Sequence, residues 1–162
     1  MRKEKTITLS DRGRELTFKI KEMPALQLER WLIRAGLLLA AAGFIDTAAV
    51  QNDAGAAVEA AGKAFAEQGL KALAAVEYDK AEPLLNELLG CCSHCGAGIE
   101  QKITPEIVDG IIEDVRTIFA LQKEAAALNL GFFAEGKAAT TPPSETPQAS
   151  AKPRGAKISL TS

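Results

Sequence analysis

The chain has 162 residues, of which 47% are apolar and 5% aromatic, and its net charge is −2. This length is enough for one modest domain with its own core. The apolar run 35–45 is too short to cross a bilayer, which needs about 18 residues, and the amino terminus lacks the continuous apolar stretch of a secretion signal. Composition therefore predicts a cytoplasmic protein and excludes a membrane partner.

Charge is divided unevenly along the chain. Residues 1–45 carry +4, residues 46–136 carry −9 and residues 137–162 carry +3. We interpret these charges chiefly as solvated groups that keep an Ala/Leu-rich protein in solution, although the three sections could also attract one another or a partner. The basic carboxyl-terminal section has no aromatic residues for base stacking and the body is acidic, so we expect no nucleic-acid partner.

The first predicted element is a β-hairpin over about 5–21. Apolar and polar residues alternate on both sides of a Ser-Asp-Arg-Gly turn, and Gly13 can take the positive φ that a tight turn requires. Phe18 lies on the apolar side of this alternation and is a candidate core residue. Two strands alone are marginally stable, so the hairpin must pack on another element.

A helix over about 24–42 should supply that cover. Pro24 suits its first turn, Gly43 suits its end, and Trp31 is a candidate core anchor. Its apolar residues recur at three- and four-residue spacing: Leu28, Trp31, Leu32, Ala35, Leu38, Leu39 and Ala42.

The pattern stays helical beyond Gly43. An alanine-rich segment over about 54–76 predicts one or two helices interrupted near Gly62 and Gly69, and a leucine stripe predicts a helix over 79–90 with Pro83 near its first turn.

The cap-like run Thr104-Pro105-Glu106 predicts a long helix over about 105–130, packed as a spine against the Trp31 helix, with Phe119 in the core. Residues 134–162 are rich in Pro, Thr, Ser and Ala and carry basic charge, which predicts a disordered tail. The predicted fold class is thus mainly α with a small N-terminal β-hairpin (α+β), a compact helical bundle over 1–133 followed by the tail.

All three cysteines and the single histidine fall within Cys91-Cys92-Ser93-His94-Cys95. A zinc site normally needs a second ligand pair from a separate segment, and redox catalysis by a Cys-x-x-Cys motif is typical of βαβ surroundings. We therefore interpret the cluster as a surface loop with reduced thiols and expect no metal, although two chains could share an ion across an interface.

Other catalytic patterns are weaker. A Ser-His-Asp arrangement would depend on His94, and no nucleophile-elbow motif is present. Asp109 and Glu113 are four residues apart and are expected to be solvated. We predict a non-enzymatic protein without a cofactor.

Several segments resemble the tail assembly chaperones of long-tailed, siphovirus-type bacteriophages. The resemblance is carried by residues 16–25 (LTFKIKEMPA), by Glu29-Arg30-Trp31 and Ile33-Arg34-Ala35, by residues 81–89 (AEPLLNELL), and by Ile118-Phe119-Ala120-Leu121 with Leu130-Gly131-Phe132-Phe133. It covers 16–133 in patches, and the cysteine cluster departs from the family pattern.

The resemblance implies a role in tail morphogenesis within the host cytoplasm. Such a chaperone binds the tape measure protein, keeps it soluble and helps recruit tail tube subunits, and it is expected to be absent from the mature virion. Self-association remains open. Exposed leucines would make the contacts, and we nominate Leu37, Leu38 and Leu70. The alternatives are a structural virion or connector component and a small phage-encoded regulator of a host protein.

Overall fold

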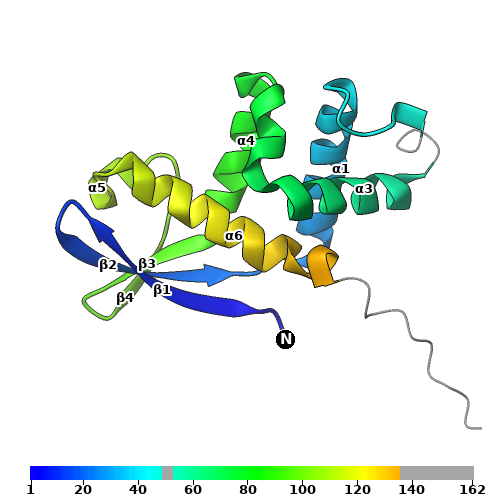
Figure 1. The fold of residues 1–162 in the computed structure, drawn as a ribbon. Helices are drawn as coiled ribbons and strands as arrows, with labels where there is room; N and C mark the ends of the chain where they lie inside the picture. The colour runs from blue at the N-terminus through cyan, green and yellow to red at the C-terminus, as the bar shows by residue number, and fades with distance from the viewer. Residues whose placement is uncertain (49–52, 136–162) are drawn as a thin grey trace, which may run out of the picture.

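The computed structural model describes residues 1–48 and 53–135. Its described part combines helices with a four-stranded antiparallel sheet in the order β1-β2-β3-β4, so the fold is α+β (Figure 1). The strands are β1 (Glu4–Asp11), β2 (Arg14–Lys21), β3 (Cys92–Gly96) and β4 (Ile99–Lys102). The helices are α1 (Ala25–Ala41), α3 (Ala54–Gln68), the 3-10 helix η1 (Gly69–Ala75), α4 (Tyr78–Leu89), α5 (Val108–Ile111) and α6 (Val115–Glu135). Among the described helices none is long and apolar enough to cross a membrane.

The β1–β2 hairpin closes through a two-residue turn. Asp11 pairs with Arg14, and the residues between them, Arg12 and Gly13, have φ values of 47° and 85°. Two successive positive φ values define a type I′ turn, whose twist matches that of the flanking strands. The alternation then places Phe18 and Ile20, both fully buried, on the face of the sheet that the helices cover.

The sheet is larger than the sequence predicts, because the cysteine cluster forms a strand instead of a surface loop. β3 pairs with β2, with Phe18 opposite His94 and Ile20 opposite Cys92. A second positive-φ turn at Ala97 and Gly98 joins β3 to β4. The prediction was wrong because glycines at both ends of a five-residue segment read as loop punctuation, while the strand is specified by its pairing with β2.

The long helix predicted over 105–130 is divided. Residues 104–107 form a turn, α5 is a single helical turn, and residues 112–114 are extended before α6 begins at Val115. Asp114 caps α6, because its carboxylate accepts a hydrogen bond from the Arg116 backbone N–H at 2.9 Å. α6 packs mainly on α3, α4 and the first two strands, not on the Trp31 helix as predicted (Figure 1). It continues through residues 134 and 135, whereas the rest of the predicted tail lies outside the described residues.

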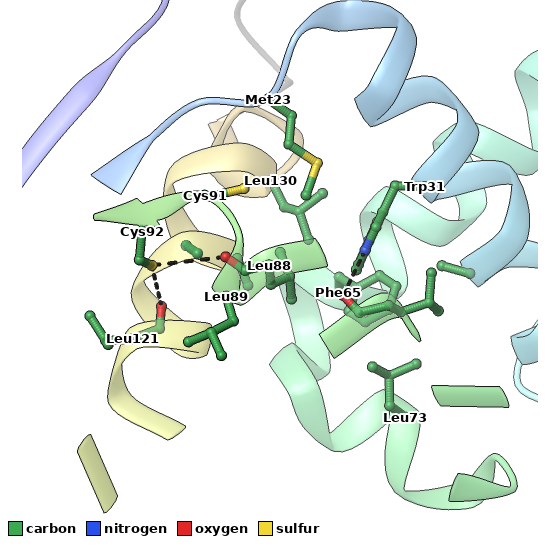
Figure 2. Packing of buried hydrophobic residues seen from close by; sticks show 14 of the residues in the cluster. Met23, Trp31, Phe65, Leu73, Leu88, Leu89, Cys91, Cys92, Leu121 and Leu130 are labelled. Atoms are coloured by element: carbon green, nitrogen blue, oxygen red, sulfur yellow. Dashed lines mark hydrogen bonds between the residues drawn. The ribbon is translucent and has the colours of Figure 1, made fainter. Parts of the chain in front are cut away.

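The core joins the sheet, α1, α3, α4 and α6 in one cluster (Figure 2). Trp31 is fully buried, packs on Phe65 with ring centroids 5.1 Å apart, and donates its indole N–H to the Leu84 carbonyl at 3.0 Å. Phe119 does not belong to this core: its side chain is 60% exposed. The later start of α6 makes Leu121 and Ala125 the inward positions, which turns Phe119 away from the sheet.

A buried amide fixes α6 against the junction between β2 and α1. The Asn129 side chain is fully buried and accepts a hydrogen bond from the Met23 backbone N–H at 2.7 Å. Its NH₂ group donates to the Ala125 carbonyl at 2.8 Å. The Met23 N–H precedes Pro24, where regular helix bonding has not begun, so Asn129 satisfies a donor that would otherwise be buried without a partner.

Candidate functional site

Two of the three cysteines, Cys91 and Cys92, lie in the structural core. Cys92 is fully buried, and its Sγ contacts the Leu88 and Leu121 carbonyls at 3.8 and 3.9 Å (Figure 2). Burial raises the pKa of Cys91 to about 11 and the pKa of Cys92 to about 12. Both thiols are therefore protonated at neutral pH and behave as small apolar side chains.

The other members of the cluster do not assemble a metal site. His94 packs on Phe18 with ring centroids 5.7 Å apart, and Cys95, the next residue of the strand, lies on the opposite face of the sheet. Within residues 1–48 and 53–135 there is no group of three or more His, Cys, Asp or Glu side chains that could hold a metal ion.

A buried carboxylate, Asp11, joins the hairpin turn to the start of α6. It accepts hydrogen bonds from the backbone N–H groups of Glu113 and Asp114, at 3.0 and 2.8 Å, and from the Thr117 hydroxyl at 2.9 Å. Arg14 lies 3.3 Å away. Burial alone raises the pKa of Asp11, but these hydrogen bonds outweigh it and hold the pKa below its ordinary value. This carboxylate therefore fixes the hairpin turn to the segment that precedes α6 and to Thr117 in the first turn of the helix.

An apolar groove runs between α1 and α4, and two of the three predicted contact residues lie in it. Its volume is about 330 Å³, and it is lined by Arg34, Leu37, Leu38, Lys80, Pro83 and Leu84. Leu37 is 52% exposed, and Leu38 is half-buried against the core. We refer to these six residues as the α1–α4 groove.

The walls of the α1–α4 groove are fixed by contacts that cross between the two helices. The Trp31 indole bonds to the Leu84 carbonyl, and Arg34 forms an ion pair with Glu87 at 2.6 Å. Pro83 cannot donate a backbone hydrogen bond, and its ring adds an apolar surface to the exposed side of α4. The groove is therefore preformed, with apolar side chains at its base and two cations, Arg34 and Lys80, at its rim.

The third predicted contact residue, Leu70, lies in a separate groove. This groove has a volume of about 260 Å³ and lies between α3, η1 and α6. Its lining is mostly apolar: Phe65, Ala66, Gly69, Leu70, Lys123, Ala126, Ala127, Leu130, Gly131 and Ala134. The sequence thus predicted residues of two grooves, and the structure does not bring them into one surface.

A cleft of about 640 Å³ beside the β2–α1 junction, with charged residues in its lining, was not predicted from the sequence. Its lining contains three basic and three acidic residues, and two of them, Lys21 and Glu100, form an ion pair at 2.5 Å. The cleft combines residues from four distant segments, and no single motif in the sequence marks it.

Comparisons with known proteins identify no relative. No family model, no curated protein and no solved structure matches this chain.

Proposed function

We propose that this chain is a tail assembly chaperone of a long-tailed bacteriophage, which binds the tape measure protein and keeps it soluble in the host cytoplasm. Two lines of support lead to this proposal. The first is the resemblance of residues 16–133 to that family, and the second is the α1–α4 groove. The groove is the observation that carries the proposal, because it offers a preformed apolar surface without a cluster of catalytic groups.

The apolar lining of the groove, with cations at its rim, suits an amphipathic helix. Leu37 rises from the exposed side of α1, and Leu26, which is 57% exposed, lies eleven residues earlier on the same side of the helix. A partner helix lying along this side would bury both leucines and Pro83. Burial of apolar surface contributes about 25 cal/mol per Å² before the costs of association, so a few such side chains support a reversible contact.

The groove that contains Leu70 provides a second apolar surface on another side of the molecule. In the proposed function it receives the tail tube subunit, while the α1–α4 groove holds the tape measure segment. Two separate surfaces would allow one chaperone to bring both proteins together. Once the tail tube had assembled on the tape measure protein, the chaperone would be released and would be absent from the finished virion.

Co-expression with a candidate tape measure protein tests the proposal. We expect the pair to co-purify and the tape measure protein to move from the insoluble to the soluble fraction. If the tape measure protein stays insoluble and this chain is found in purified virions, the chaperone proposal is wrong and a structural role is supported instead.

A further inference from the structure

The two edges of the sheet are exposed to very different extents. β4 has only four residues, all exposed, with Glu100 and Lys102 among them. β1 has eight residues, and its central stretch, residues 6–10, carries no charge and no proline. Short, charged edge strands resist pairing with other chains, whereas long, flat, uncharged ones favour it. β4 is thus a protected edge and β1 an open one.

The direction of the backbone groups along β1 follows from its pairing with β2. The Lys3 carbonyl accepts a hydrogen bond from the Glu22 N–H at 2.9 Å, so odd-numbered residues on this side of the hairpin direct their backbone groups at β2. Antiparallel pairing alternates these directions. The N–H and C=O groups of Thr6, Thr8 and Ser10 therefore point outward, away from the sheet.

We propose that β1 pairs antiparallel with β1 of a second copy of this chain, about a twofold axis at Thr8, which joins the two sheets into one. Thr8 then faces Thr8 of the second copy, and the outward groups of Thr6 bond to those of Ser10. This inference is independent of the proposed chaperone function, because it rests on the sheet edge and uses neither apolar groove.

The side chains that this register brings together are complementary. Ile7 of each copy faces Leu9 of the other, and both are only partly buried within one chain. Leu9 lines an open cleft of about 410 Å³ between β1 and α6, and an isoleucine from the second copy would cover this cleft. Lys5 faces Asp11, the last residue of β1, at both ends of the interface, which places opposite charges across from one another.

A shift of the pairing by two residues loses this complementarity. Centring the strands on Ile7 would place Lys5 opposite Leu9, and centring them on Leu9 would place Ile7 opposite the carboxylate of Asp11. A shift by one residue would mix the two faces of the sheet, which the burial of one face forbids. The register about Thr8 is therefore the one that the strand specifies.

The mass of the full-length chain in solution, measured by light scattering after size exclusion, tests the dimer first. We expect twice the 17.1 kDa chain mass at micromolar concentration. Thr8→Pro removes an N–H that points away from β2, and proline is tolerated on edge strands, so we expect the dimer to weaken by about tenfold or more. A wild-type chain that is still monomeric at about 100 µM would overturn the proposal, since this concentration is about a hundredfold above the expected dissociation constant. A dimer that Thr8→Pro leaves unchanged would overturn it as well.

Disulfide trapping tests the register even if Thr8→Pro fails to fold. In a Cys95→Ser background the remaining thiols, Cys91 and Cys92, are buried. Thr8→Cys should form a covalent dimer on mild oxidation, because facing residues in such a pair lie about 5.5 Å apart at Cα, within disulfide range. Ser10→Cys alone should form no covalent dimer, because Ser10 does not face Ser10 of the second copy. A mixture of Thr6→Cys and Ser10→Cys chains should form one, because these two positions face each other. Equal trapping at all positions, or none at Thr8, would show that the strands do not pair in this way.

Discussion

The layer formed by the sheet and α6 differs in chemistry from the side of the molecule that carries the α1–α4 groove. α6 is fixed by buried polar groups: Asp11 accepts hydrogen bonds from the backbone just before the helix, and Asn129, near the end of the helix, accepts one from the Met23 N–H. The α1–α4 side depends mainly on packing of leucine, alanine and Trp31, and part of its apolar surface stays exposed. Buried polar groups require one arrangement, whereas apolar surfaces tolerate several partners. We infer that the layer of the sheet and α6 specifies the fold, whereas the side with the α1–α4 groove is available for binding.

Removal of the Asp11 carboxylate should have the largest effect on stability. Asp11→Ala leaves two backbone N–H groups and the Thr117 hydroxyl without their acceptor. Hydrogen bonds to charged groups contribute about 1.5–3 kcal/mol each, with incomplete additivity, so we expect a loss of about 3–4 kcal/mol in the free energy of unfolding. Urea denaturation measures it. Glu15→Ala, an exposed residue of the same hairpin, is the control and should change stability by less than about 0.5 kcal/mol.

The same carboxylate should make the fold sensitive to acid. The pKa of Asp11 is lowered in the folded state, so its contribution is present above the unfolded value of about 3.9 and is lost as the pH falls through the folded value. Hydrogen bonds from Arg116 lower the pKa of Asp114 to about 2, which acts in the same direction. Thermal melts between pH 5 and pH 2 should show a steep loss of stability. In Asp11→Asn the loss should be shallower, and identical slopes would contradict the assignment.

Removal of the Asn129 amide should destabilise the fold by about 2–3 kcal/mol. Asn129→Ala leaves the buried Met23 N–H without an acceptor and creates a small cavity. Asn86→Ala is the matched control, since this side chain is only partly buried at the surface of α4, and it should cost less than about 1 kcal/mol. Chemical denaturation of both variants measures the difference, and equal losses would show that Asn129 is not a specific clamp.

Two glycines that differ only in their surroundings should respond to alanine with opposite signs. A Cβ at Gly62 in α3 would lie 2.5 Å from the Phe133 ring, so Gly62→Ala should destabilise the protein by about 1–2 kcal/mol although alanine favours helices. Gly131 in α6 has nothing within 4 Å of the corresponding position. Gly131→Ala should therefore stabilise by up to about 1 kcal/mol. Thermal melts measure both changes, and a shift of the melting temperature in the same direction for both variants would contradict the close packing of α3 on α6.

The parts of the fold that follow from local pattern were predictable, and the parts that depend on distant contacts were not. The hairpin, its positive-φ turn at Gly13 and the burial of Phe18 and Trp31 follow from alternation and helical spacing. The break before α6 depends on Asp11, about a hundred residues earlier in the chain, which no local pattern reveals. Phe119 was assigned to the core because the wrong helix start rotated the predicted apolar face.

The candidate site was predictable only in part, for a similar reason. Leu37 and Leu38 lie on the α1 side of a groove whose other wall, Pro83 and Leu84, comes from a helix more than forty residues later. Periodicity identifies the exposed side of one helix but not the helix that lies beside it. Leu70 was assigned to the same surface because nothing in the sequence separates the two grooves.

The most direct test of the central claim is the effect of Leu37→Glu on the tape measure protein. Leu37 is 52% exposed, so the substitution should change the free energy of unfolding by less than about 0.5 kcal/mol. Ile99→Glu, at a 69% exposed residue of β4, is the matched control. In co-expression, Leu37→Glu should return most of the tape measure protein to the insoluble fraction, whereas Ile99→Glu should keep it soluble. Full solubility with Leu37→Glu would contradict the claim that the α1–α4 groove binds this partner.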